Sequence, residues 1–174
     1  MSKQYILTDA TLFIDGVGTF GKATSVEVPA IKPIKTDHNP IDGVGTQKLP
    51  TGKFEIDTFK TTLNCFYPDV FSAVANPFNA VLIQVYGNLM GFSDGSQDGN
   101  EQALLTMKCS AAEYKALCDK KEQDAPSWDL TFDPSSINLV FNNKELINLD
   151  LDNNDVSIGG VDLRADILKN LGIR

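Results

Sequence analysis

A glycine-rich segment near the start of the sequence has the spacing of a dinucleotide-binding motif. Gly16, Gly18 and Gly21 match the G-x-G-x-x-G pattern, and the same stretch approaches a phosphate loop but lacks the Ser or Thr that binds magnesium. Both motifs need a helix directly after the glycines, because the N-terminus of that helix holds the phosphates. Residues 24–28 are rich in β-branched side chains, and Pro29 follows them, which favours extended structure. The segment is therefore interpreted as a glycine turn.

Two acidic clusters imitate the ligand spacing of a calcium-binding loop. Asp94, Ser96 and Asp98 stand at the first three ligand positions and are followed by a glycine, but Leu105 stands where a bidentate Glu is needed. In the second cluster, at residues 150–155, an aspartate occupies the position of the required glycine. Both clusters are interpreted as solvated turns. We expect no metal and no cofactor.

Residues that could carry catalysis are few. His38 is the single histidine and lies in a polar loop, so a Ser-His-Asp triad would have to run through it, and the sequence contains no nucleophile elbow. Glu55 and Asp57 have the types of an acid/base pair, but the exposed face of a strand carries such pairs routinely. The sequence therefore predicts that the protein is not an enzyme.

The composition is typical of one globular domain. The chain has 174 residues, of which 42% are hydrophobic and 22% charged, and its 13 glycines and 8 prolines favour a turn-rich β fold. Cys65, Cys109 and Cys118 are odd in number and widely spaced, so we expect reduced, buried thiols. No stretch has the apolar length of a membrane span, and the start MSKQY lacks the form of a secretion signal, so a cytosol-like setting is expected. The formal charge of -8 argues against a protein that grips nucleic acid.

The apolar spacing predicts mainly strands. Strands are predicted at 11–15, 25–28, 53–59, 80–89 and 102–108. Alternation is clear at 53–59, where Phe54 and Ile56 would face the core. The strongest hairpin signal is the pair of alternating runs that flank Asn142-Asn143. Short helices are predicted at Pro68–Ala75, which begins with proline, and at Val161–Leu171. At Ser110–Gln123 local propensity favours a helix.

A long polar segment, Asp37–Pro50, joins two strand-like stretches. It contains a proline and flexible glycines and has few apolar residues with which to pack on its own domain. Ordering such a segment costs conformational entropy, which a partner must offset. We therefore expect residues 36–50 to be an interaction arm, with Ile41, Val44 and Leu49 as its contacts on another subunit.

Three stretches together resemble the major tail tube proteins of contractile-tail bacteriophages and related contractile bacteriocins. Residues 10–16 (ATLFIDG) are similar to the family's NLFIDG-like first strand, and residues 28–32 (VPAIK) are similar to its LPKL segment. Residues 158–163 (IGGVDL) and 168–172 (LKNLG) follow the family's NGVD…RNDLG ending in order and spacing. The likeness covers nearly the whole chain, but the segment Asp37–Pro50 lacks the family's Gly-rich YRAGG stretch.

The resemblance implies a single domain, residues 1–174, that forms an antiparallel β-sandwich or partly open barrel with one or two short helices. Six copies would form a ring with a continuous β-barrel, and the rings would stack into the inner tail tube of a virion assembled in the host cytoplasm. Its partners would be other copies, the tail sheath protein, the baseplate and tail terminator, and the tape measure protein. The family layout also implies a strand, not a helix, at Ser110–Leu117.

The channel of such a tube must let DNA pass without binding it. Acidic side chains suit this role because they repel phosphates. Glu55 and Asp57 alternate with apolar residues on one strand and are predicted to face the channel. The alternatives are the tube of a bacteriocin or injection system, and a monomeric β-sandwich that binds a carbohydrate or peptide; for the latter, Trp128 is the only tryptophan.

Overall fold

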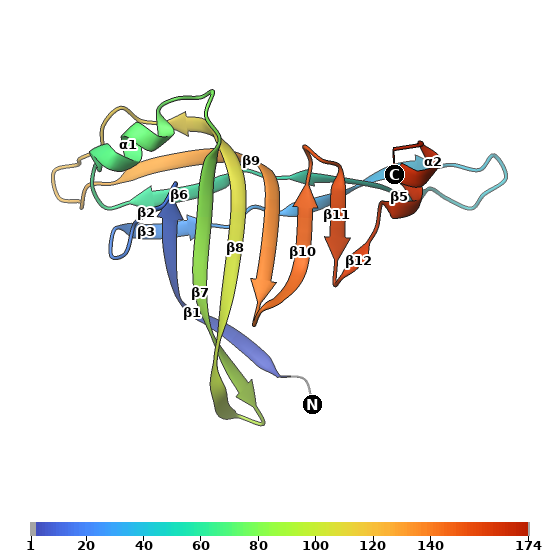
Figure 1. Cartoon of the computed structure of the whole chain (residues 1–174), viewed down its shortest axis with the longest axis horizontal. Coiled ribbons are helices and arrows are strands. Elements are labelled where there is room, and N and C mark those ends of the chain that lie inside the picture. The colour runs from blue at the N-terminus through green and yellow to red at the C-terminus, as the bar shows by residue number, and fades with distance from the viewer. Residues whose placement is uncertain (1–2, 174) are drawn as a thin grey trace.

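The computed structural model describes residues 3–173, which form mainly antiparallel strands and two short helices (Figure 1). Met1, Ser2 and Arg174 lie outside this range. The strands of the first half are β1 (Gln4–Ile14), β2 (Val17–Gly18), β3 (Ala23–Glu27), β4 (Ile31–His38), β5 (Gln47–Ile56) and β6 (Phe59–Leu63). After helix α1 (Pro68–Val74) come β7 (Val81–Ser93), β8 (Ser96–Tyr114), β9 (Trp128–Phe141), β10 (Lys144–Asp150), β11 (Asp155–Ile158), β12 (Val161–Asp162) and helix α2 (Ala165–Asn170).

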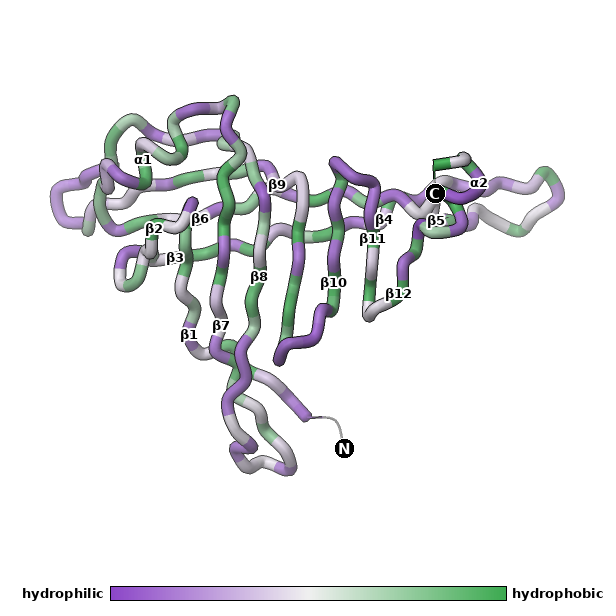
Figure 2. Tube along the Cα trace, in the orientation of Figure 1, coloured by the Kyte–Doolittle hydropathy of each residue, from purple (hydrophilic) through white to green (hydrophobic). Residues whose placement is uncertain are grey.

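Most strands belong to one antiparallel sheet, the main sheet, in the order β12-β11-β10-β9-β8-β7-β1-β2. Long hairpins build its centre, because β7 pairs with β8 and β8 with β9 over most of their lengths. Apolar and polar residues alternate along these strands (Figure 2). Burial alternates in the same way, which places one face of the sheet on the core and leaves the other face more polar.

The long strand β9 connects the main sheet to a second layer. Its first half pairs with β6, which also pairs with β3, whereas its second half pairs with β10. The two halves meet at Pro134, where the pairing with β8 shifts its register. In Figure 1 the layer of β3 and β6 crosses behind β1, β7 and β8 at a steep angle. The bend in β9 therefore lets one strand contribute to both layers of the core.

The core lies between these two layers and is closed by α1. Trp128 is fully buried, packs against the rings of Phe66 and Phe71, and donates its indole N–H to the Lys115 carbonyl oxygen at 2.9 Å. The other buried apolar residues of the core come from both layers and from the helix; the largest are Phe59, Phe132, Leu12, Ile14, Leu63, Ile83, Met107, Leu130, Leu149, Val70 and Val74.

Two parts of the molecule project from this core. The β4–β5 hairpin forms a separate two-stranded sheet and extends sideways beyond α2, and we call it the arm (Figure 1). The end of the β7–β8 hairpin, together with the first residues of β1, extends away from α1 (Figure 1). Residues 3–173 contain no closed barrel. Neither helix in this range has the length and apolar character that would be needed to span a bilayer.

Several predictions from the sequence are confirmed. The fold is mainly antiparallel β, α1 occupies all but the last residue of the predicted helix at 68–75, and the hairpin turns at Asn142-Asn143, both with positive φ. Phe54 and Ile56 are half-buried and pack on the core. The strand predicted at Ser110–Leu117 is present as far as Tyr114, because these residues pair with the first half of β9.

Two predictions are corrected. The terminal helix is shorter than the predicted Val161–Leu171, since Val161 and Asp162 pair with β11 and the helix begins only at Ala165. The segment Asp37–Pro50 is not one long loop. Both of its ends continue the paired strands β4 and β5, and only residues 39–46 between the His38–Gln47 pair lie outside them.

Replacing Trp128 with alanine tests the core. The change removes a fully buried ring system and should lower the free energy of unfolding by about 3–5 kcal/mol. Phe78, which is 94% exposed, supplies the control, and its replacement with alanine should change the free energy by less than about 0.5 kcal/mol. Urea denaturation followed by circular dichroism measures both. Equal effects of the two substitutions would contradict this description of the core.

Candidate functional site

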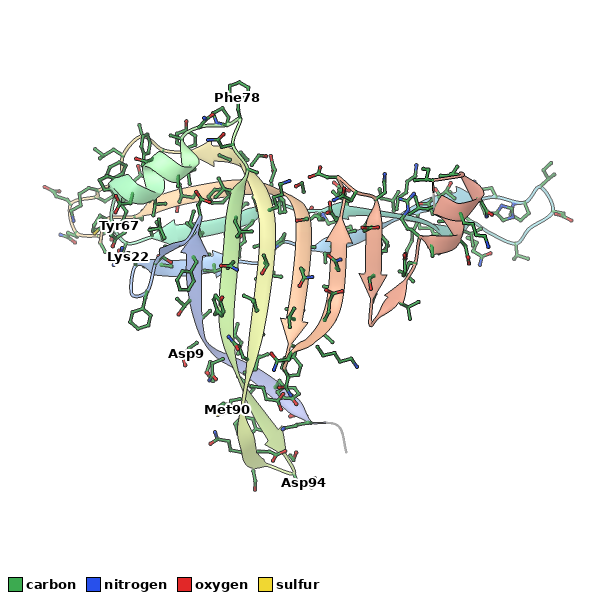
Figure 3. The ribbon with its side chains drawn as sticks, in the orientation of Figure 1. Asp9, Lys22, Tyr67, Phe78, Met90 and Asp94 are labelled. Carbon is green, nitrogen blue, oxygen red and sulfur yellow. The ribbon has the colours of Figure 1, made fainter. Side chains whose placement is uncertain are left out.

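The ligand-like motifs of the sequence lie in turns. A strand, β3, follows Gly21 where a nucleotide-binding fold would need a helix, and Lys22 lies over the ring of Tyr67 with its Nζ 4.5 Å from the centroid (Figure 3). Asp94 lies in the turn that closes the β7–β8 hairpin, at the tip of the molecule (Figure 3). Among residues 3–173 no group of three or more His, Cys, Asp and Glu side chains is placed to hold a metal ion.

The potential catalytic residues are not brought together. His38 is exposed at the end of β4. Cys109 is buried in the core, and burial raises the pKa of its thiol to about 12, which keeps it protonated at neutral pH. Cys118 is half-buried, but Cys65 is exposed, so the prediction of three buried thiols is wrong for Cys65. Because neither the ligand-like motifs nor the potential catalytic residues form a site, the candidates for a functional site are the surface and the strand edges.

One end of the main sheet is the outer edge of β1. Phe13 and Ile14 pair there with β2, and the Leu12 carbonyl oxygen accepts hydrogen bonds from the backbone N–H and the hydroxyl of Thr19. The edge of residues 4–11 has no strand partner within residues 3–173. Tyr5, Ile6 and Leu7 are 38%, 55% and 57% exposed along this edge. An unpaired row of backbone N–H and C=O groups beside apolar side chains is a template for pairing with another chain.

The other end of the main sheet is formed by β11 and the short strand β12. Beyond β12, no further strand continues the sheet within residues 3–173. Ile158, Val161 and Leu163 are 39%, 62% and 46% exposed at this end. The chain thus carries two different strand edges, both lined by apolar side chains, at opposite ends of one sheet.

The first residues of β1 are held by polar contacts with β8 and by an aromatic contact with the end of β9. The Lys3 Nζ lies 3.2 Å from both Glu101 Oε1 and Asp98 Oδ2, and Tyr5 packs edge-on against Phe141 with 5.0 Å between ring centroids. The hydrogen bond to Glu101 and then that to Asp98 raise the pKa of Lys3, and the bond from Lys3 lowers the pKa of Asp98. These contacts fix the free edge in place.

Two glycines of β7 lie where the side chains of Lys3 and Leu7 pass over that strand. A Cβ at Gly87 would lie 2.8 Å from Leu7 Cδ1, and one at Gly91 would lie 2.6 Å from Lys3 Cε. A β-bulge between Leu7 and Asp9 turns the strand at the same place. Sequence reasoning missed this arrangement, in which the glycines of β7 leave room for the ends of the Leu7 and Lys3 side chains.

The two carboxylates predicted to face a channel lie at the base of the arm. Glu55 is exposed on β5, opposite Lys32 in the register of the hairpin. Asp57 follows β5, and its Oδ2 lies 2.7 Å from Lys32 Nζ. Asp57 raises the pKa of Lys32 through this hydrogen bond and its charge. Lys32 thus offsets part of the negative charge here, and a channel-facing role of Glu55 and Asp57 stays a prediction.

The polar face of the main sheet carries a row of uncharged polar side chains that the sequence did not reveal. Cross-strand pairing aligns one residue from each of five neighbouring strands into a row of uncharged hydrogen-bonding side chains: Gln84, Thr106, Asn138, Asn148 and Ser157. All five are half-buried. Such a row provides no cation to which a phosphate could bind.

The apolar residues predicted for the arm are exposed to different extents. Ile41 and Val44 lie in the tip, at 107% and 110% relative exposure, and Leu49 lies on β5 at 37%. The tip thus presents two aliphatic side chains that contact nothing on their own domain.

Neutralising Lys3 tests how the free edge is held. Lys3→Met should increase amide hydrogen exchange in residues 4–7, because the ion pairs with Glu101 and Asp98 are lost. In the unchanged protein Lys3 stays protonated up to its raised pKa, which lies above 10.5. Its ion pairs with Glu101 and Asp98 are therefore lost only when the pH rises through that pKa. Asp98 stays ionised down to its lowered pKa, which lies below 3.8, so its ion pair with Lys3 is lost only when the pH falls through that pKa. Lys60→Met, at an exposed position on β6, is the control; equal exchange in both variants would refute the role of Lys3.

A search of curated proteins found no match. The family model described as phage tail tube protein FII matches residues 4–172, which is almost the whole chain and includes both sheet edges and the arm. The chain therefore belongs to the phage tail tube protein FII family, a family of structural proteins.

Proposed function

We propose that the chain is the subunit of the inner tube of a contractile phage tail, in which six copies form a ring and stacked rings form the tube that delivers DNA. The observation that carries this proposal is the pair of unlike, apolar-lined strand edges at the two ends of the main sheet. Membership of the tail tube family supports self-assembly into a tube in general.

Ring closure follows from pairing these two edges. If the β1 edge of one copy pairs with the β11–β12 edge of the next, the contact is head-to-tail, and such contacts close into a ring when the rotation per copy divides a full turn. The main sheets would then form one ring-wide barrel, which removes the exposed edges. The apolar side chains at both edges would be buried in the same step.

The remaining partners follow from this position in the tail. The tail sheath would enclose the tube, the baseplate and the tail terminator would bind its two ends, and the tape measure protein would fill it before firing. The virion tail would be completed in the host cytoplasm. The similarity of residues 10–16 and 158–172 to tubes of contractile systems supports this choice.

Two surfaces of the subunit are candidates for the wall of the channel. The first holds Glu55 and Asp57, as predicted from the sequence, and the second is the uncharged row on the main sheet that includes Thr106 and Asn138. Neither would attract phosphates strongly, which suits passage without binding. An added lysine distinguishes the two surfaces, since a cation in the channel wall attracts DNA and one elsewhere does not.

Lysine substitutions therefore test the channel. If the prediction from the sequence is right, Glu55→Lys with Asp57→Lys should leave tubes intact but reduce DNA delivery, because each ring would gain cations along the channel. Asn138→Lys is the matched variant for the main-sheet surface. Delivery assays on reconstituted virions, with electron microscopy of the tubes, give the result. Normal delivery with Glu55→Lys and Asp57→Lys, but impaired delivery with Asn138→Lys, would assign the wall to the main sheet.

Shortening the arm tests assembly. Replacing Asp37–Lys48 with Asn-Gly closes the hairpin at the Thr36–Leu49 pair with a two-residue turn. The variant should give the circular dichroism spectrum of a folded β protein but remain monomeric, because the arm's contacts with other subunits are lost. Negative-stain microscopy of the unchanged protein should reveal rings or tubes, and tubes formed equally well by the shortened variant would refute the role of the arm.

A further inference from the structure

A pocket of about 500 Å³ lies at the base of the arm, where β4 and β5 meet β10, β11 and the segment that contains α2. Its walls are largely aliphatic. Leu149 and Val156 belong to the buried core, whereas Ile34, Leu151 and Leu171 are 42%, 42% and 63% exposed. An aliphatic pocket with a partly exposed rim has the form of a receptor for apolar side chains.

The pocket also carries positive charge. Lys53 and Arg164 line it, Lys53 makes no ion pair within residues 3–173, and the Arg164 Nε has no hydrogen-bond partner there. Asp150 is the acidic residue of the lining, and the bonds that its carboxylate accepts from the side chain and backbone of Asn153 and from the backbone of Asp152 lower its pKa and keep it charged. Two cations therefore face one carboxylate, which leaves the lining with an excess of one positive charge. The pocket therefore suits an occupant that combines aliphatic side chains with a carboxylate.

The tip of the arm has this chemistry. Ile41 and Val44, the two most exposed apolar residues among those described, flank Asp42 in the tip. Burial of two aliphatic side chains is favourable, and Asp42 would meet the cations of the pocket.

The tip cannot reach the pocket of its own chain. The pocket includes Ile34, and seven residues of an extended arm separate Ile34 from Ile41, which corresponds to about 23 Å at roughly 3.3 Å per residue. Folding back would break the cross-strand pairs between Lys35–Pro50 and His38–Gln47. The occupant must come from another molecule.

We propose that the tip of one copy, Ile41–Val44, docks in the pocket at the arm base of a neighbouring copy. The contact joins two different surfaces of the same chain, so it propagates head-to-tail, as ring or tube assembly requires. It rests on the proposed function for the presence of neighbours and adds to it the surface that receives the arm.

Site-directed cross-linking tests the contact. Val44→Cys and Leu171→Cys are placed in a background of Cys65→Ser and Cys118→Ser, while the buried Cys109 is kept. A short bismaleimide should join copies into covalent oligomers when the protein is assembled. The control pairs Val44→Cys with Leu117→Cys, which is exposed to the same degree as Leu171, at 64% against 63%. Cross-linking that is no stronger at Leu171 than at Leu117 in assembled protein would overturn the docking site.

Charge substitution gives an independent measurement. Leu171→Glu should weaken self-association by about tenfold or more, because it places a carboxylate in the aliphatic pocket, whereas Leu117→Glu should leave it unchanged. Analytical ultracentrifugation measures both variants. If rings form but Leu171→Glu has no effect, the docking site is wrong and the proposed function stands. If the unchanged chain never forms oligomers, both proposals fail.

Discussion

The unpaired edges of the main sheet are the constraint on which the rest of the account depends. Each backbone N–H and C=O at a strand edge needs a partner, and water supplies one in the monomer. Here the edges also carry apolar side chains, Tyr5–Leu7 at β1 and Ile158, Val161 and Leu163 at the other end. A protein that works alone usually blunts such edges with charges, prolines or covering segments. This chain instead holds its β1 edge in position with Lys3 and Tyr5.

The core explains why the edges are rigid enough to pair. β9 bends at Pro134 and belongs to both layers, so the centre of the main sheet is packed against β6 and α1. Trp128 joins the layers through its ring contacts and its hydrogen bond to Lys115. The arm, by contrast, is a two-stranded sheet whose tip contacts little of its own domain. In this arrangement the edges of the stiff sheet would join copies by backbone pairing, and the projecting arm would join them by side-chain docking.

Local patterns in the sequence predicted those elements whose causes are local. Asn142-Asn143 adopts the positive φ values that a tight hairpin needs, and Pro68 begins α1. At Ser110–Tyr114 helix propensity was overridden by pairing with residues 130–133 of β9, which are distant in the sequence, and only the family resemblance indicated the strand. The hairpin form of the arm was missed because the segment Asp37–Pro50 is polar and contains a proline and glycines, yet its ends pair across a two-stranded sheet.

The candidate site was predicted only in part. Ile41 and Val44 are exposed, as the polarity of the segment around them suggests, but their contacts with another subunit stay a prediction. The sheet edges, the pocket and the uncharged row on the main sheet depend on residues that are distant in the sequence. Gln84 and Ser157, for example, share a row only because four intervening strand pairings bring them there. No local pattern contains that information.

Cryo-electron microscopy of the assembled protein is the most direct measurement of the central claim, which is that copies join by pairing the two edges of the main sheet. The expected result is a ring in which the backbone of residues 4–11 in one copy pairs with the β11–β12 edge of the next, so that the sheets form one continuous barrel. An assembled tube in which both edges face solvent, or in which subunits meet only through their arms, would contradict it.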